Sequence, residues 1–352
     1  MNKPKIRIIH ETNPQKYFPA LFELAETGQI EIVGAHRYSV VKEWMRAYFV
    51  DRTPFLKRSQ NTFNDLLFRL RIPFVKDETI ILGFAPWDWR LLIYRFLADR
   101  NRIIYHTSWH DWRIDSTPRQ PKILWFKRYM QKKWHAFVNL SQVKVIAVTQ
   151  EVAKTVAKET GVIGSVIPHA VPSPFFEAAK NRISSEKGPL RLLFVGEVSE
   201  KKGIRILLKL LDEFKEQEVT LTVVGNGPLV HLVKNGSNQV NYLGQISDRA
   251  KLAQIMAEHD ILMLLSQKTK NWEELFGIVI IEAIASGCAI IATDHIGPRE
   301  ILGNVGGVGL FSESDYEGIC SKLRAIKSDS VKLEKLRNQQ RIASRYSMLT
   351  IK

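Results

Sequence analysis

Short runs of apolar, β-branched residues alternate along the chain with longer segments whose apolar residues recur at helical spacing. This alternation is typical of parallel strands joined by crossover helices. The predicted strands are 6–10, 30–35, 79–84, 102–106, 143–149 and 165–168 in the first half, and 191–195, 220–224, 241–243, 261–265 and 289–292 in the second. The pattern predicts an α/β protein with two doubly wound units, whose ligands lie at the carboxyl ends of the strands.

A stretch with three prolines and mixed charges, residues 171–189, separates the two sets of strands. Prolines in such a segment favour a linker. We therefore expect an N-terminal domain over 1–170, a linker over 171–189 and a C-terminal domain over 190–352. Two domains of roughly 150 to 200 residues suit a chain of 352 residues.

The composition, 45% hydrophobic and 25% charged, is that of an ordinary globular protein and excludes collagenous or low-complexity classes. No stretch approaches the roughly 20 uncharged residues that span a bilayer. The two cysteines, Cys288 and Cys320, have no metal-binding spacing and form no framework of bridges. We expect a cytoplasmic protein without a metal.

The net charge of +15 is concentrated in the first half. Residues 1–180 hold 28 basic and 16 acidic side chains, against 23 and 20 in the remainder. Such a field attracts nucleic acid, an anionic membrane or a phosphorylated substrate. A basic nucleic-acid-binding protein is thus an alternative class, although no recognition module is discernible.

The most informative stretch runs from Glu274 to Gly287. Apolar residues at helical spacing predict a helix that starts near Gly277, and Gly287 suits its left-handed C-terminal cap. Unpaired amides at a helix start favour a diphosphate. The carboxylates of Glu274 and Glu282 could then hold hydroxyls at the two ends of a nucleotide sugar; two ordinary surface carboxylates are the alternative.

This stretch resembles the Glu-x7-Glu signature of the retaining GT-B glycosyltransferases of family 4. Further segments that are similar to family motifs, in the family's order, are 193–203, 223–228, 240–244 and 294–300, with 145–149 and 166–171 in the first half. The resemblance implies two Rossmann-like domains, the second of which binds a UDP- or GDP-linked sugar. It implies neither a metal nor a further cofactor.

The resemblance also implies roles for single residues. Lys202 would neutralise the leaving phosphates, Glu274 would contact the donor sugar and Glu282 the ribose. Together with these, the implied donor-binding residues are Gly196, Gly225, Phe276, Gly277, Ile278 and Val279. Glu274 and Lys202 are candidate catalytic residues.

One residue departs from the family pattern. Glu197 stands where the family usually has an arginine that completes the cationic clamp on the diphosphate. Either another cation, such as Lys201, Arg205 or Arg299, substitutes for that arginine, or the donor is handled differently.

In the first half, His106 lies in a His-Thr-Ser core that looks like the segment that brings a histidine to the reaction centre in lipid-directed members of the family. It is the third catalytic candidate; a histidine satisfied at a strand end is the alternative. Two tryptophan clusters follow consecutive strands and suggest an acceptor site, because aromatic faces pack on sugars; core packing is the alternative. The acceptor candidates are Trp87, Asp88, Trp109, His110 and Asp111.

Residues 116–150 contain no acid. On a helical wheel the stripe that packs on the sheet is Ile123, Phe126, Met130, Trp134 and Phe137. The opposite face, with Trp125, Arg128, Tyr129 and Lys132, has the chemistry of a membrane contact, and Lys42 to Arg58 is a second such region. A solvated helix face is the alternative in both cases.

These observations favour a retaining hexosyl- or N-acetylhexosaminyl-transferase. Its expected acceptor is a polyprenyl-diphosphate-linked glycan at the inner face of the cytoplasmic membrane, as in bacterial surface polysaccharide assembly, and no nucleic acid is involved. An epimerase or phosphorylase of the same architecture is the alternative among enzymes.

Overall fold

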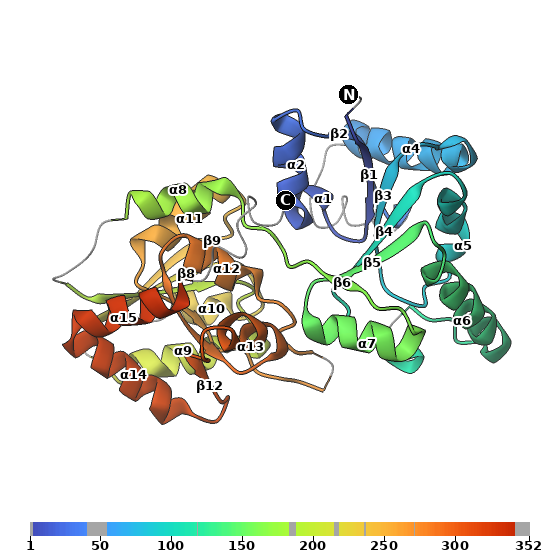
Figure 1. Ribbon diagram of the computed structural model, residues 1–352. Helices are drawn as coiled ribbons and strands as arrows, with labels where there is room; N and C mark the ends of the chain where they lie inside the picture. Colours follow the sequence, from blue (N-terminus) through green and yellow to red (C-terminus); the bar gives the residue numbers. More distant parts are fainter. Residues whose placement is uncertain are drawn as a thin grey trace. The chain divides into compact units, whose positions relative to one another are not determined.

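The computed structural model describes residues 3–40, 55–117, 119–182, 188–214, 218–235, 237–270 and 272–341. The chain divides into two compact units, Met1–His169 (unit 1) and Ala170–Lys352 (unit 2), and both are α/β (Figure 1). In the described part of the chain, no helix is both long enough and apolar enough to cross a membrane.

Unit 1 contains a six-stranded parallel sheet in the order β2-β1-β3-β4-β5-β6. Its strands are β1 (Lys5–His10), β2 (Glu31–Arg37), β3 (Thr79–Gly83), β4 (Arg102–Thr107), β5 (Val143–Ala147) and β6 (Ser165–Val166). The order reverses between β1 and β3, and such a switch point opens a crevice at the carboxyl ends of the two strands.

The helices of unit 1 flank its sheet (Figure 1). They are α1 (Pro14–Tyr17), α2 (Pro19–Glu26), α4 (Phe55–Arg71), α5 (Leu91–Tyr94), α6 (Leu124–Val138) and α7 (Gln150–Thr160), with short 3-10 helices η1 (Ile72–Phe74), η2 (Arg95–Asp99) and η3 (Ile114–Ser116). Much of the core is aromatic: Trp87, Trp112, Trp134 and Tyr105 are fully buried and in mutual ring contact.

Unit 2 repeats the architecture with the order β12-β11-β10-β7-β8-β9, again all parallel. Its strands are β7 (Leu190–Val195), β8 (Val219–Val224), β9 (Val240–Gly244), β10 (Ile261–Leu264), β11 (Ala289–Thr293) and β12 (Leu310–Phe311). The switch point lies between β7 and β10. The predicted pair of doubly wound parallel sheets is therefore confirmed, and only the short β12 has no predicted counterpart.

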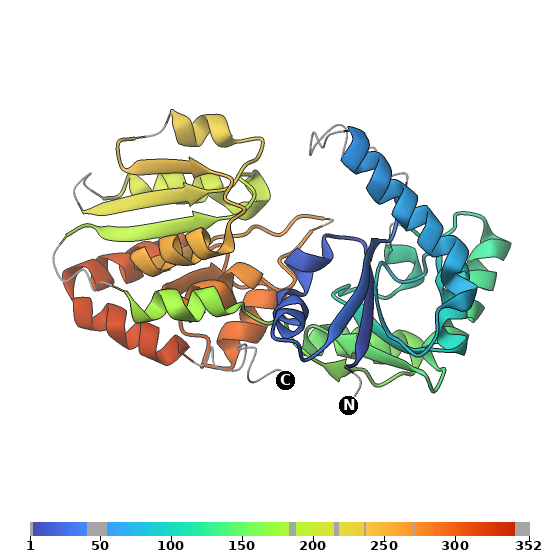
Figure 2. The ribbon, with the colours of Figure 1, turned by 90° about the horizontal axis from the view of Figure 1, so that it is seen from above.

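Helices cover the sheet of unit 2 (Figure 2). They are η4 (Glu200–Lys202), α8 (Ser173–Lys180), α9 (Ile204–Leu211), α10 (Val230–Lys234), α11 (Arg249–Glu258), α12 (Ile278–Ala285), α13 (Ile296–Gly303), α14 (Tyr316–Ser328) and α15 (Ser330–Gln340). The α8 helix corrects the prediction of a linker over 171–189. Pro172 and Pro174 start this helix rather than prevent it, because proline suits the first turn, and buried Phe175 ties it to the unit.

A buried carboxylate, Asp260, fixes the amino-terminal edge of the second sheet. It accepts from Arg182 after α8 at 3.2 Å, from Arg191 in β7 at 3.1 Å and from Arg337 in α15 at 2.9 Å. One aspartate therefore joins three separate segments of the fold, at the edge opposite the predicted ligand site.

Candidate functional site

The loops after β7 and β8 lie in backbone contact at the carboxyl edge of the second sheet. Gly225 has a positive φ of 143°, and a Cβ there would lie 1.8 Å from the carbonyl oxygen of Gly196. The Gly196 amide donates to Val224 O at 3.0 Å. Glycine is thus required at Gly225 for the close approach of these loops. Two of the predicted donor-binding glycines lie together.

The helix predicted between Gly277 and Gly287 is present as α12. Gly277 precedes it with φ 69°, and Gly287 follows it in the left-handed conformation at φ 79°. The first residues, Ile278 and Val279, have no helical partner for their amides, as at every helix start. The start of α12 therefore places backbone donors beside the end of β10.

Lys202 and Glu274 form an ion pair at this edge. The Lys202 ammonium donates to the Glu274 carboxylate, which also accepts from the hydroxyl of buried Ser266 at 3.4 Å. Both side chains are largely buried, with 18% and 12% exposed. The structure thus brings together the lysine that is predicted to neutralise the leaving phosphates and the glutamate that is predicted to contact the donor sugar.

Glu282 has the charge partner that its burial demands. Only 4% of the residue is exposed, and Arg249 at the start of α11 donates to its carboxylate. The Arg249 guanidinium lies 4.8 Å from the ring centroid of Phe175 in α8. The alternative of an ordinary surface carboxylate is therefore wrong for Glu282.

Glu197, the departure from the family pattern, pairs with Lys201 at 2.7 Å. The other two candidate cations are engaged elsewhere, Arg205 with Glu200 at 2.7 Å and Arg299 with Asp294 at 2.8 Å. Both of those pairs are more exposed than the Lys202 pair. Lys201 is therefore the candidate cation that lies beside Lys202.

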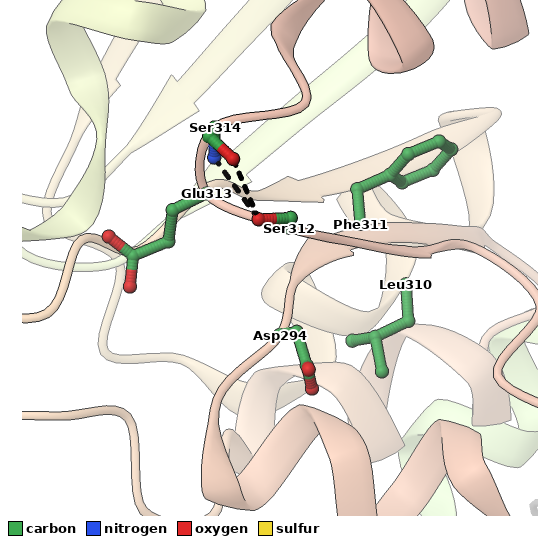
Figure 3. A pocket seen from close by; sticks show the side chains of 6 residues that line it. All are labelled: Asp294, Leu310, Phe311, Ser312, Glu313 and Ser314. Carbon is green, nitrogen blue, oxygen red and sulfur yellow. Dashed lines mark hydrogen bonds between the residues drawn. The ribbon is translucent and has the colours of Figure 1, made fainter.

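An acidic pocket of about 440 Å³ lies at the carboxyl ends of β11 and β12 (Figure 3). The residues that line it are Asp294, Leu310, Phe311, Ser312, Glu313 and Ser314. Ser314 hydrogen-bonds the Ser312 hydroxyl through both its amide and its side chain. The predicted donor-binding residues lie outside this pocket, whose two carboxylates make it a poor site for a diphosphate.

The carboxyl edge of unit 1 has a different character. His10 at the end of β1, His106 in β4 and His169 after β6 surround Tyr17 of α1, with ring centroids 4.1, 5.6 and 4.6 Å from that of the tyrosine. The His10 ring packs on Gly83, where a Cβ would lie 2.0 Å from His10 Cδ2. Four strands thus contribute to one cluster at the switch point.

Burial lowers the pKa of all three histidines. The pKa of His10 falls to about 3, that of His169 to about 4, and that of His106 lies well below its usual value. Among the described residues, the buried Nδ1 atom of His106 has no hydrogen-bond partner. His106 is therefore a neutral imidazole near pH 7. The alternative, a strand-end histidine whose ring nitrogens are hydrogen-bonded within the fold, is wrong for its Nδ1 atom.

The acceptor candidates divide into buried and partly buried residues. Trp87 donates to the Trp112 carbonyl at 2.6 Å and belongs to the core, and the Asp88 carboxylate is fully buried against Arg90. For these two the expectation of sugar contacts is wrong, because their side chains are enclosed by unit 1 itself.

The loop after β4 holds the other three acceptor candidates. Trp109, His110 and Asp111 are all partly buried. Asp111 accepts two strong hydrogen bonds from the Arg113 guanidinium, and this pairing holds the pKa of the carboxyl well below its usual range. These residues stay acceptor candidates.

The outer face of α6 is exposed as predicted, at Trp125, Arg128, Tyr129 and Lys132. On the other face Met130, Trp134 and Phe137 are buried. The expected packing of Ile123 on the sheet is wrong, since 59% of this residue is exposed just before the helix. Of the second region, Lys42 to Arg58, residues 42–54 and the Lys57 and Arg58 side chains lie outside the described residues.

Helix α4 adds an apolar surface that sequence reasoning missed. Leu56, Phe63 and Leu70, seven residues apart, are strongly exposed, as are Leu66 and Phe74. Figure 2 shows α4 at the outside of unit 1. Residues seven apart lie on one side of a helix, so these side chains form an exposed stripe.

Other site residues escaped the sequence analysis for an identifiable reason. His10, His169 and Arg249 are single residues without periodic or paired neighbours, although His169 lies within the segment 166–171 that is similar to a family motif. His10 and His169 are brought close together by the order of the strands in the sheet. Arg249 is recognised as a site residue by its ion pair with Glu282. The burial of Glu282 is the one signal that could have pointed to a partner such as Arg249.

Residues 175–345 match the family model described as Glycosyl transferases group 1. The match covers nearly all of unit 2 and includes Lys202, Glu274 and Glu282. Unit 1 lies outside the match.

Curated relatives are similar to part of the chain. The phosphatidyl-myo-inositol mannosyltransferase of Mycobacterium tuberculosis (strain ATCC 25618 / H37Rv) is 30% identical over 148 residues, 40% of this chain and 38% of that protein. The 2-deoxystreptamine N-acetyl-D-glucosaminyltransferase of Niallia circulans is 26% identical over 183 residues, 50% of this chain and 45% of that protein. The chain thus matches less than half the length of each relative.

Solved structures are similar over the whole chain. Anabaena Alr3699/HepE in complex with UDP and glucose has a TM-score of 0.63 at 19% identity, covering 99% of this chain and 97% of that one. WaaG, a glycosyltransferase involved in lipopolysaccharide biosynthesis, has a TM-score of 0.58 at 14% identity, covering 97% and 95%. The fold is therefore the two-domain, Rossmann-like GT-B fold.

Proposed function

We propose that this chain is a glycosyltransferase that moves a sugar from a UDP- or GDP-linked donor to a glycan acceptor. The observation that carries the proposal is the carboxyl edge of unit 2. There the Lys202–Glu274 pair lies beside the start of α12, within residues that match the family model. Backbone amides and an ammonium group provide a positive field for a diphosphate without a metal ion.

Each residue at this edge has a distinct part in the proposed reaction. The amides at the start of α12 and the Lys202 ammonium bind the diphosphate and stabilise the charge that develops as the nucleotide leaves. Glu274 exchanges its ion pair with Lys202 for hydroxyls of the donor sugar. Glu282, whose charge Arg249 compensates, accepts from the ribose hydroxyls.

We further propose transfer with retention, with a hexosyl or N-acetylhexosaminyl group as the sugar. In a front-face reaction the leaving phosphate takes the proton of the acceptor hydroxyl, so no second carboxylate is needed as a nucleophile. Glu274 and Glu282 are therefore binding groups and do not act as the carboxylate pair of a glycosidase. On unit 1, neutral His106 is the third catalytic candidate, as the partner for a substrate hydroxyl.

The proposed acceptor is a lipid-linked glycan, polyprenyl-diphosphate-linked, at the inner face of a bacterial membrane. The exposed basic and aromatic face of α6 supports peripheral membrane contact, and so does the apolar stripe of α4. Basic residues near anionic lipid contribute about 1 kcal/mol each, and inserted aromatic side chains add a part that salt does not screen.

The proposed function is tested with a thermal-shift panel of nucleoside mono- and diphosphates. A ligand that binds only the folded chain raises its melting temperature. The nucleotide that gives the largest shift then defines the donor for a transfer assay, in which NMR of the product reports the anomeric configuration. Nucleotide release without an acceptor would point to an epimerase or phosphorylase, and an unchanged melting temperature with every nucleotide would contradict the proposal.

A further inference from the structure

Trp272 lies at the meeting of the loops that follow β7 and β10. Its ring centroid is 4.8 Å from the Lys202 Nζ atom and 5.4 Å from the Lys201 Nζ atom. Both distances are within the roughly 6 Å at which an ammonium is attracted to an indole face. One aromatic ring thus contacts two adjacent lysines.

The backbone holds the two loops together around this ring. Gly203, with φ 73°, follows the lysines, and a Cβ there would lie 1.9 Å from the carbonyl oxygen of Leu265. The Gln267 amide donates to Lys201 O at 2.8 Å, and the Thr269 amide donates to Trp272 O at 2.9 Å. The positions of the lysines and of the ring are therefore set by the same local packing.

Each lysine also has a carboxylate partner, Glu197 for Lys201 and Glu274 for Lys202. Two neighbouring ammonium groups repel each other, and the two carboxylates and the indole face offset that repulsion. A diphosphate that takes the place of the carboxylates would meet both ammonium groups already assembled.

We propose that Lys201 supplies the second cation of the diphosphate clamp and that Trp272 is the residue that positions it beside Lys202. The inference rests on the proposed donor site and explains the departure at Glu197. The second positive charge comes from the residue four positions after Glu197, and the Glu197 carboxylate holds this Lys201 when no donor is bound. Arg205 and Arg299 are less suited to this role, since more than half of each arginine side chain is exposed, 54% and 57%, against 35% for Lys201.

The test measures binding to the full chain by calorimetry with three probes: inorganic diphosphate, the nucleoside diphosphate with the largest thermal shift, and its monophosphate. We expect Trp272→Ala and Lys201→Met each to weaken inorganic diphosphate and the nucleoside diphosphate at least tenfold. The monophosphate should change less than threefold, because the second phosphate is the group that the clamp binds. Trp272→Phe should restore part of the loss, because its ring also attracts an ammonium.

Arg205→Met is the matched control, because it removes a neighbouring cation in the first turn of α9 that, among the described residues, pairs with Glu200 and does not contact Trp272. We expect it to bind all three probes as the wild type does. The double variant of Lys201→Met and Trp272→Ala should lose about as much diphosphate affinity as either single variant, because both changes remove the same positioned cation.

The outcomes separate this inference from the proposed function. If the wild type binds diphosphates and both single variants retain that affinity, the inference is wrong and the proposed function stands. Equal loss of mono- and diphosphate in Trp272→Ala, with Lys201→Met unaffected, would also overturn it, because the ring would then serve the base or the fold. If the wild type binds no diphosphate at all, both proposals fail.

Discussion

The carboxyl edges of the two sheets share a topology and differ in chemistry. In unit 2 the edge holds ion pairs, with Lys202, Glu274 and Glu197 among their members. At the switch point of unit 1 the side chains that could bind a ligand are the buried imidazoles of His10 and His106, whose pKa values lie far below the usual range. A paired-charge edge can exchange a carboxylate for a phosphate, whereas a neutral imidazole suits a hydroxyl. The difference corresponds to the proposed division between donor and acceptor.

The largest expected effect is the response of unit 1 to acid. A histidine with a lowered folded pKa is protonated more readily in the unfolded chain, so its contribution to stability is complete above about pH 6.5 and is lost as pH falls toward the folded value. Each such histidine lowers the free energy of unfolding by about 1.4 kcal/mol per pH unit in that window. For His10, His106 and His169 together the loss approaches about 4 kcal/mol per pH unit.

Tryptophan fluorescence measures this unfolding selectively, since seven of the eight tryptophans precede residue 169. The double variant of His10→Asn and His169→Asn should reduce the slope between pH 6 and pH 5 by about 2.5 kcal/mol per pH unit. Comparison with the wild type cancels the opposite contribution of Asp88, whose pKa is raised by burial. An unaltered slope would show that these histidines are already accessible to protons in the folded chain.

The second effect concerns the membrane contact that we propose for unit 1. Reversal of Arg128 and Lys132 to Glu should weaken binding to anionic vesicles by at least about 2 kcal/mol, or roughly 30-fold, and lower activity on a lipid-linked acceptor. Donor affinity and activity on a water-soluble acceptor should survive. Vesicle sedimentation at increasing salt measures the effect, and binding should fall with salt without vanishing.

Reversal of Lys154 and Lys158 on α7 is the control for this pair. It makes the same change of net charge in the same unit, on exposed residues outside the α6 face. If both reversals reduce vesicle binding equally, the α6 face has no special part, and the exposed stripe of α4 becomes the surface to test.

The third effect is confined to unit 2. Lys202→Ala should lower kcat/KM with the true donor at least tenfold, about 1.4 kcal/mol, because it removes the ammonium that stabilises the leaving phosphates. Steady-state kinetics with the donor varied measure the loss. Unchanged kinetics would remove Lys202 from the proposed site.

The smallest effect is at Glu197. Since the carboxylate pairs with Lys201 and is about half exposed, Glu197→Ala should change kcat/KM less than twofold. Glu197→Arg should tighten the nucleoside diphosphate in a binding titration, because it restores a cation at this place. Loss of all activity in Glu197→Ala would reveal a direct role for the carboxylate.

The two sheet edges also differ in how much of each could be predicted from the sequence. The α12 region was predictable, because Gly277, the apolar spacing and Gly287 form a local signal for a helix start and end. The prediction of a linker was wrong over 173–180. Proline disrupts the interior of a helix but is well suited to its first turn, and only tertiary packing decides which of the two applies here. The histidine cluster was out of reach except for His106, since His10 and His169 are far apart in sequence and only the sheet order joins them.

A calorimetric titration of the full chain and two variants with UDP and with GDP tests whether the donor diphosphate binds at the edge of unit 2. We expect one of these nucleotides to bind the wild type with one site per chain. Lys202→Ala should weaken that binding at least tenfold, while His106→Asn should leave it within about twofold, because the donor diphosphate belongs to the edge of unit 2. Loss of binding in His106→Asn together with retention in Lys202→Ala would contradict a donor site at the edge of unit 2.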